Sequence, residues 1–498
     1  MSVKRNIIAN LIGSVWGAIV VLAAIPFYIF FLGVEAYGLI GFFATLQILF
    51  FLLEMGVGAA SQREFAKWSG TQTNTEDLSD LVRVFALFYW AIALVIVILV
   101  VVLAPWLAEN WLNVTKLSMY DANVAIVLMG FSIAIRFPSV LYSSGMLGLQ
   151  KQVPLNWIKA VTDTMRGGGT VLVLWLISPT IISFFVWQII VELINTLVLR
   201  KGLWIYFPQG KKAKGFQFKQ IQKIWKFAAG MSGISILVVI LMQLDKVILS
   251  GLLTLEMFGY YTIAGSLSLG LTLLIRPIFT ATYPKLTQLV EIDDQNKIKN
   301  IYHDSCQLMA VLIVPLALVV SFFSKEILYL WTNNIAVAEH AYSVLSILII
   351  GTALNGLMNI PYALQLAHGW TSLTFYMNVV AVFFLVPLIF FMTKYYGAEG
   401  AALVWVLLNS GYVFIGIHFM HRRLLPYEKR EWYLKDIIHP VLGALVVVWP
   451  ASILIDENMS KIVTIITLGG VLFASYLSSA MMSSTMRRYF LTYRQQGL

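Results

Sequence analysis

Apolar stretches of about 20 residues recur along the whole chain and are separated by short polar segments. A helix of this length crosses the ~30 Å hydrocarbon core of a bilayer. The pattern predicts an all-α polytopic membrane protein with an even number of crossings, so that both termini lie on one side. We place fourteen membrane-spanning helices at residues 7–32, 37–60, 84–104, 122–142, 155–177, 180–199, 228–252, 257–282, 306–324, 341–366, 373–393, 398–420, 437–455 and 461–482.

The positions of lysine and arginine predict the orientation. Of the 34 such residues, 26 lie at the N-terminus, in the loops on its side of the membrane and in the C-terminal tail. Only Lys116, Lys325, Lys394 and Lys461 lie in the opposite loops. Because cytoplasmic loops carry the excess of basic residues, we expect both termini to be cytoplasmic.

Composition and the absence of certain motifs limit the classes of protein to which the chain can belong. The chain is 59% hydrophobic and 12% charged, about half the charge of a soluble protein. The apolar run after MSVKRN is too long for a cleavable signal, so we expect it to remain as the first helix. A single cysteine, Cys306, and scattered histidines predict no disulfide and no metal. The chain has no phosphate-binding GxxxxGK[ST] loop and no long outer loop with paired carboxylates, which favours a transporter over an ATPase or a membrane enzyme.

A basic segment, GKKAKGFQFKQIQKIWKF at 210–227, interleaves lysines with aromatic and aliphatic residues at helical spacing. This pattern is typical of an interfacial helix that binds anionic membrane lipids. Alternatively, the lysines reflect only the excess of basic residues in cytoplasmic loops. We expect no nucleic-acid partner, because no folded domain is predicted to present the patch.

Two segments repeat at an offset of 221 residues: LGVEAYGLIGF at 32–42 and LTLEMFGYYTI at 253–263. The identical pairs are Leu32 and Leu253, Glu35 and Glu256, and Gly38 and Gly259. Each copy joins two spans, so the pattern predicts two parallel six-helix lobes with substrate between them, unless glutamate before glycine is only a recurrent helix-entry signal. The predicted domains are an N-terminal lobe at 1–200, a basic linker at 201–227, a C-terminal lobe at 228–420, and two further helices with a tail at 421–498.

Charged residues inside the spans predict the site, because such residues face the bundle interior or a wet cavity. The cations suit an anionic substrate, and the planar fork of arginine suits phosphate. The acids are candidates for coupling to H⁺ or Na⁺. The candidate cations are Arg136, Arg166, Lys246 and Arg276, and the candidate acids are Asp163, Glu192 and Asp245.

Each of these charged residues has a second interpretation besides lining a cavity. Asp163 and Arg166 share a helical face before three glycines, and either line a cavity or form a structural ion pair. Arg136 and Arg276 each lie close before a proline, near the cytoplasmic end, from which an arginine can also snorkel.

Asp245 and Lys246 are adjacent in the seventh span, ~100° apart on a helix, so they cannot share one narrow stripe. Lys246 is then an outer-half cavity cation with Asp245 as its ion-coupling neighbour, or both belong to a buried structural pair.

Four segments resemble the Wzx-type polysaccharide flippases: NLIGSVWGAIVVLAAIPFYIFFLGVEAYGLIGFF, LLEMGVGAASQREFA, QLDKVILSGLLTLEMFGYYTIAGSL and RPIFTATYPKL. The resemblance covers about residues 6–420. It implies membership of the superfamily that includes the MATE exporters and the lipid II flippases, with two pseudo-symmetric lobes, a central cavity and alternating access.

The resemblance also implies a substrate. Wzx-type members move oligosaccharide repeat units linked to undecaprenyl pyrophosphate from the inner to the outer leaflet of the bacterial inner membrane. It further implies a partnership with the polysaccharide polymerase machinery, and no cofactor. A MATE-like exporter of organic cations and a lipid II flippase remain alternatives. The last two spans either form a groove for the lipid tail or only pack against the second lobe.

Overall fold

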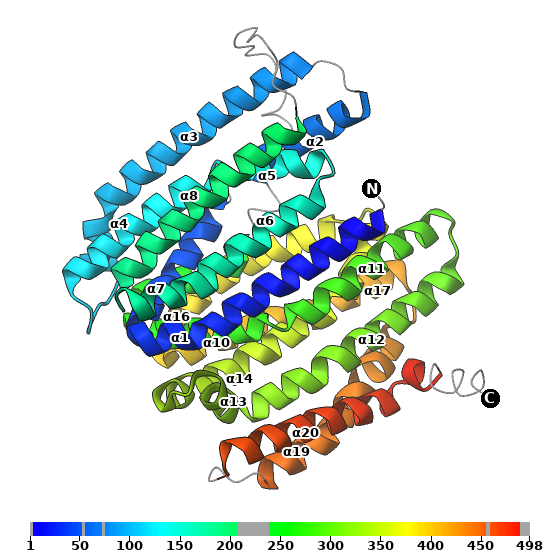
Figure 1. Cartoon of the computed structure of the whole chain (residues 1–498). Coiled ribbons are helices and arrows are strands. Elements are labelled where there is room, and N and C mark those ends of the chain that lie inside the picture. The colour runs from blue at the N-terminus through cyan, green and yellow to red at the C-terminus, as the bar shows by residue number, and fades with distance from the viewer. Residues whose placement is uncertain (1–2, 52–54, 72–74, 208–238, 455–458, 489–498) are drawn as a thin grey trace. The chain divides into compact units, whose positions relative to one another are not determined.

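The computed structural model describes residues 3–51, 55–71, 75–207, 239–454 and 459–488. Within these ranges the chain is helical, with one isolated bridge between Asn113 and Thr254, and no named strand. The chain divides into two compact units, Met1–Gly259 and Tyr260–Leu498 (Figure 1). The predicted all-α class is confirmed for the described residues.

The first unit contains long helices joined by short turns. Residues 239–252 are also helical and continue toward α10. The named elements are α1 (Val3–Phe51), α2 (Met55–Thr71), α3 (Thr75–Trp106), α4 (Met119–Arg136), α5 (Ser139–Gly148), α6 (Gln152–Thr164), α7 (Thr170–Leu176), α8 (Ile181–Tyr206) and the start of α10 (Leu255–Leu269).

The second unit contains the rest of α10 and the helices that follow it. In this unit α19 and α20 pack side by side, and both contact α12 (Figure 1). The elements are α11 (Thr272–Glu291), α12 (Gln295–Phe322), α13 (Ser324–Thr332), α14 (Ile335–Leu357), α15 (Asn359–Ala367), α16 (Ser372–Gly411), α17 (Ile417–Leu424), α18 (Lys429–Glu431), α19 (His439–Leu454) and α20 (Lys461–Met482).

Ten helical segments in the described part of the chain are long and apolar enough to cross a membrane. Two of them each contain a glycine with a positive φ, Gly33 at 81° and Gly397 at 57°, which divides the segment into two. The predicted span 155–177 is represented by α6 and α7, and part of the span 228–252 lies outside the described residues. This arrangement is consistent with fourteen spans and does not by itself establish that number.

Short polar residues set the start of several helices. Each accepts a hydrogen bond from a backbone N–H of the first turn, which would otherwise lack a partner. These residues are Ser118, Thr180, Asp294, Asn334 and Ser460. Along α3, large apolar side chains are exposed. Leu87 and Val102 are 72% and 69% exposed, as expected for a helix that faces lipid.

The two repeated segments pack against each other within the first unit. A Cβ added at Gly38 would collide with the carbonyl oxygen of Leu255, and a Cβ added at Gly259 would collide with that of Val34. Gly38 corresponds to Gly259 and Val34 to Leu255 in the repeat, so the contact is reciprocal. We call this backbone-to-backbone contact the glycine junction.

Most of the predicted basic linker at 201–227 lies outside the described residues, and the segment 210–227 lies outside them entirely. The cytoplasmic location of the termini and the predicted lobe boundaries remain predictions.

Candidate functional site

Four of the seven predicted charged residues meet in the first unit. The guanidinium of Arg166 contacts Asp163 Oδ1 at 2.7 Å and Glu192 Oε1 at 2.8 Å. Arg136 Nη1 lies 3.9 Å from the same Glu192 oxygen. We call Arg136, Asp163, Arg166 and Glu192 the arginine cluster. It joins α4, α6 and α8 through one buried carboxylate, because the Glu192 side chain is only 1% exposed.

The backbone around Arg166 departs from the α-helix. Residues Met165–Gly169 form a π-helical turn between α6 and α7, an irregularity frequent at functional sites. Side chains hydrogen-bond to carbonyls around this turn: Tyr28 donates to Arg166 and Gly167 at 3.3 and 3.2 Å, and Trp187 donates to Met165 at 2.8 Å. The turn therefore holds Arg166 in place through contacts from α1 and α8.

Glycines on α1 allow this helix to approach α6 closely. A Cβ added at Gly17 would lie 2.9 Å from Asp163 Oδ2, and one added at Gly13 would lie 2.7 Å from Asn156 Oδ1. The Gly13–Gly17 pair thus has the packing role typical of a GxxxG motif. It leaves room for the Asp163 carboxylate beside α1.

Arg136 is the most exposed member of the arginine cluster. Its side chain is 44% exposed, against 26% for Arg166, and its Nη1 donates to Gln47 Oε1 at 3.0 Å. The ion pair with Glu192 is long, so part of the guanidinium remains available to another anion. This is the chemistry that a phosphate-binding position requires.

The formal charges of the arginine cluster balance, with two cations and two carboxylates. The structure thus forms the Asp163–Arg166 ion pair that was one of the two sequence interpretations. The other oxygen of Glu192, Oε2, is buried and has no hydrogen-bond partner in the described part of the chain. A carboxylate oxygen in this situation is a candidate position for a proton or a small cation.

The other three predicted residues lie apart from the arginine cluster. Lys246 is half-buried on the helix 239–252, with Nζ 3.5 Å from Gln243 Oε1, and Asp245 is half-buried beside it. Arg276 lies exposed on α11 in the second unit, next to Pro277. The roles predicted for these three residues stay predictions.

Sequence reasoning missed a buried carboxylate of the first unit. Glu35 is buried and accepts hydrogen bonds from the backbone N–H groups of Thr115, Lys116 and Leu117 at 2.5, 2.6 and 2.9 Å. Lys116, held by this contact, pairs with Glu256 at 2.7 Å. The repeat already matched Glu35 with Glu256, but it could not show that both bind one loop.

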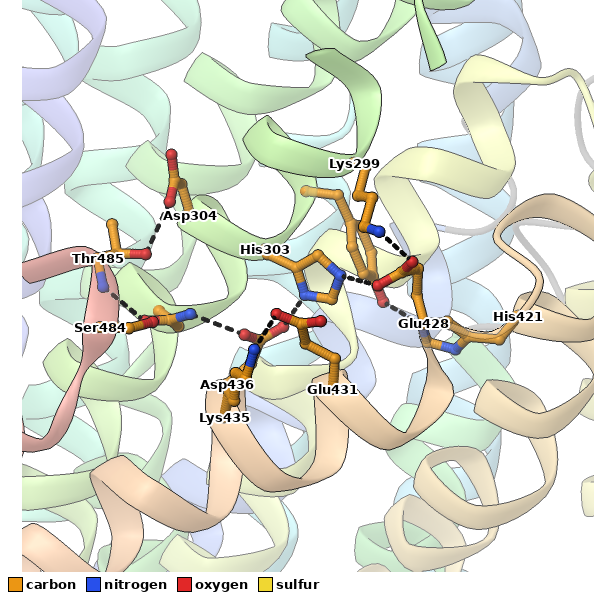
Figure 2. Close-up of polar contacts among 12 residues, drawn as sticks. Lys299, His303, Asp304, His421, Glu428, Glu431, Lys435, Asp436, Ser484 and Thr485 are labelled. Atoms are coloured by element: carbon orange, nitrogen blue, oxygen red, sulfur yellow. Dashed lines mark hydrogen bonds and ion pairs between the residues drawn. The ribbon is translucent and has the colours of Figure 1, made fainter. Parts of the chain in front are cut away.

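A second polar cluster was also missed. It lies in the second unit around His303 and includes Glu428 and Asp436 (Figure 2). The sequence contains little sign of this cluster, because the partners of His303 lie more than 120 residues away in the chain. No group of three or more side chains among the described residues has the arrangement of a metal site.

Comparisons with known proteins identify the family. The chain matches the polysaccharide biosynthesis protein family over residues 3–290 and the MatE family over residues 231–391. It is 21% identical to the "Putative O-antigen transporter" of Shigella flexneri over 407 residues, covering 81% of this chain and 94% of that protein.

Solved structures show the fold. The lipid II flippase MurJ in an inward closed conformation superposes with a TM-score of 0.73 at 16% identity, covering 98% of this chain and all of that one. An inward-facing MATE family multidrug transporter of the MOP superfamily gives 0.66 at 13% identity, covering 85% and 95%. These relatives are transporters, and the predicted fold class and resemblance are confirmed. The chain belongs to the polysaccharide biosynthesis protein family, and its fold is that of the lipid II flippase MurJ and of the MATE family transporters.

Proposed function

We propose that this transporter is a flippase that moves oligosaccharide repeat units linked to undecaprenyl pyrophosphate across the bacterial inner membrane by alternating access. The family match and the O-antigen transporter of Shigella flexneri support the substrate class. The structural observation that carries the proposal is the half-exposed guanidinium of Arg136, which lies 3.9 Å from Glu192 inside an apolar helix bundle.

The physical problem is the passage of a pyrophosphate through hydrocarbon, because an unpaired anion there is very costly. A guanidinium replaces hydration of the phosphate by two directed hydrogen bonds, while the polyprenyl tail stays in lipid. Glu192 competes with the substrate for Arg136, so the anion is held weakly enough to be released on the other side. Lys246 and Arg276 are further candidate cations for the transport path.

Coupling to H⁺ or Na⁺ is assigned to the acids of the first unit. Glu192 is the leading candidate, because Oε1 is shared by two arginines and Oε2 is buried without a hydrogen-bond partner in the described residues. An ion at Oε2 would weaken the hold of Glu192 on Arg136 and so favour substrate binding. Asp163 and Asp245 are the alternative coupling residues.

The glycine junction is the proposed point of closure during alternating access. Its two sides are equivalent positions of the repeat, and the Lys116–Glu256 ion pair lies next to it, with side chains 68% and 25% exposed. An exposed ion pair is worth little, about 0–1 kcal/mol, so it can break in each cycle. By the distribution of basic residues, this junction is on the outer side and both termini are cytoplasmic.

Complementation tests the proposal. Deletion of the gene should abolish a surface polysaccharide and should cause its undecaprenyl-pyrophosphate-linked repeat unit to accumulate in the cell. Arg136→Ala should restore little polysaccharide although the protein is present in the membrane at the normal level. Lys67→Ala is the matched control, because Lys67 is an exposed cation whose ion pair with Glu64 lies within α2.

The other outcomes identify the alternatives. Unchanged polysaccharide with increased sensitivity to organic cations would indicate a MATE-like exporter. Arrest of cell-wall synthesis with accumulation of lipid II would indicate a lipid II flippase. Full restoration by Arg136→Ala would remove Arg136 from the substrate path.

A further inference from the structure

The cluster around His303 joins three parts of the second unit. His303 and Gln307 come from α12, Glu428 and Asp436 come from residues 428–436, and Ser483–Thr485 follow α20, as Figure 2 shows for this region. The side chains of His303 and Asp436 are 9% and 0% exposed. Hydrogen positions in such a buried cluster follow from which atoms can only donate and which can only accept.

Gln307 fixes the state of one Asp436 oxygen. The backbone N–H of Thr485 can only donate, and it contacts one atom of the Gln307 amide at 3.0 Å, so that atom is the oxygen. The hydroxyls of Ser483 and Ser484 reach the same oxygen at 2.8 and 3.1 Å. The Gln307 nitrogen therefore points to Asp436 Oδ1 at 2.9 Å, where the carboxylate accepts.

The imidazole of His303 then lies between two carboxylate oxygens. Nδ1 is 2.5 Å from Asp436 Oδ2, and Nε2 is 3.2 Å from Glu428 Oε2. Each of these two contacts needs one proton, because two lone pairs facing each other repel. A neutral imidazole carries only one such proton. With both carboxylates ionised, the cluster is one proton short, so this geometry holds one additional proton.

A neighbouring histidine provides the contrast. His421 Nδ1 lies 3.1 Å from the carbonyl oxygen of Ile417, which can only accept, so Nδ1 carries the proton. Its Nε2 lies 3.2 Å from the hydroxyl of Tyr302, which can donate. His421 is thus fully satisfied as a neutral ring, and it needs no second proton.

The charged and titratable groups facing His303 come from several elements. Lys299 of α12 pairs with the other oxygen of Glu428, and Lys435 pairs with Glu431 at 2.7 Å. In these contacts the three acids Glu428, Glu431 and Asp436 face two lysines, and the excess acid favours a positive charge on His303. The groups around the ring are Lys299, Tyr302, Asp304 and Cys306 from α12, His421 from α17, Glu428, Glu431, Lys435 and Asp436 from residues 428–436, and Arg488 beyond α20.

We propose that His303, Glu428 and Asp436 form a binding site for one proton, and that the bound proton fastens residues 428–436 to α12. Loss of the proton places a lone pair of Nε2 against the Glu428 carboxylate, and the segment then separates from His303. Residues 428–436 lead directly into α19, so the docking of α19 and α20 on α12 responds to the proton concentration. The site is distinct from the arginine cluster and does not rest on the proposed function.

The test is histidine NMR on the full-length protein in liposomes, with ¹⁵N-labelled histidine. The spectrum of His303→Gln assigns the His303 signals by subtraction from those of the six histidines. We expect both ring nitrogens of His303 to be protonated at low pH and one of them to lose its proton between about pH 5 and 8. His421 should stay neutral over this range.

Two variants separate the proton site from a passive contact. In Glu428→Gln the amide can donate to Nε2 directly, so His303 should stay neutral throughout and residues 428–436 should stay docked. Glu431→Gln is the matched control, because no hydrogen bond joins Glu431 to the ring, and it should preserve the transition.

Amide exchange of residues 428–436 measures docking in the same samples, referenced to the unfolded peptide. As the pH rises above the pKa of an unperturbed histidine, about 6.5, protection of wild type should fall about tenfold per pH unit until docking is lost, as expected for release of one proton. A His303 ring that keeps a single N–H across the range would overturn the proposal, and so would a Glu428→Gln profile identical to wild type. If Glu428→Gln does not fold, the wild-type titration alone decides.

Discussion

Each unit of the molecule contains a fully buried carboxylate, and the two are held by different chemistry. Glu192 in the first unit is 1% exposed and is held by arginine, whose charge does not depend on pH in the physiological range. Asp436 in the second unit is 0% exposed and is held by His303 and Gln307, of which the histidine can lose its charge. A buried carboxylate is therefore stabilised by a permanent cation in the first unit and by a titratable group in the second.

This difference predicts different behaviour. The arginine cluster should be insensitive to pH through its cations, and any response to an ion must enter through its acids. The cluster around His303 should respond directly to protons. The two clusters can be distinguished by removing the side chains that hold each buried carboxylate and comparing the effects on stability and amide exchange.

Removal of Arg166 should have the largest effect. Arg166→Met leaves Glu192 buried with only the distant Arg136, and breaking a buried ion pair in this way costs about 3–5 kcal/mol of the free energy of unfolding. Reversible unfolding in mixed micelles at pH 6 and pH 8 measures the cost, which should be the same at both values. Arg166→Met with Glu192→Leu should recover part of the loss. A strongly pH-dependent cost would contradict the assignment of a permanent cation.

Removal of Gln307 should have the second largest effect. Gln307→Leu leaves Asp436 Oδ1 and the donors of residues 483–485 without their partner, and each unsatisfied buried group costs about 1–3 kcal/mol. We expect increased amide exchange in residues 483–488 before any change in the first unit. Ser321→Ala is a control on the same helix, because in the described part of the chain the Ser321 hydroxyl bonds to Ser346 of α14. Unchanged exchange would show that Gln307 does not fasten the C-terminal segment.

The sequence predicted much of the arginine cluster but not its state of pairing. Helical spacing placed Asp163 and Arg166 on one face, and burial of charge marked Glu192 and Arg136 as important. Spacing could not show that one carboxylate, Glu192, binds both arginines, because the contact joins separate helices. It also could not show the π-helical turn, which depends on side chains such as Tyr28 and Trp187 bonding to the carbonyls around it.

The second cluster could not be predicted at all. His303 and Asp436 are polar residues at the ends of apolar spans, where the sequence pattern indicates only a membrane boundary. Their importance depends on a contact across 133 positions. The repeat was more informative, because the matched glycines Gly38 and Gly259 take part in one reciprocal contact. Residues that differ between the two halves have no matched counterpart, so the repeat could not predict their contacts.

A substitution at Gly17 should have a smaller effect on the arginine cluster. In Gly17→Ala the new methyl group would lie 2.9 Å from Asp163 Oδ2, so the carboxylate must move and its bond to Arg166 weakens. Gly470→Ala in α20 is the matched control, because among the described residues no heavy atom beyond its neighbouring residues and the backbone of its own helix lies within 4 Å of its Cβ position. Both variants gain about 1 kcal/mol of helix propensity. We expect Gly17→Ala to be less stable than Gly470→Ala by about 1–2 kcal/mol, and equal stabilities would contradict the close approach of α1 to α6.

The coupling between Arg136 and Glu192 should be the smallest effect. A double-mutant cycle with Arg136→Met and Glu192→Gln should give about 0–1 kcal/mol, because the pair is 3.9 Å apart and Arg136 is 44% exposed. The corresponding cycle with Arg166→Met should give several times more. This inequality is what makes Arg136 available to a substrate anion: a guanidinium bound tightly by Glu192 would have to break that pair before it could bind phosphate. Equal coupling energies would place Arg136 and Arg166 in one structural network and leave the first unit without an accessible arginine in this cluster.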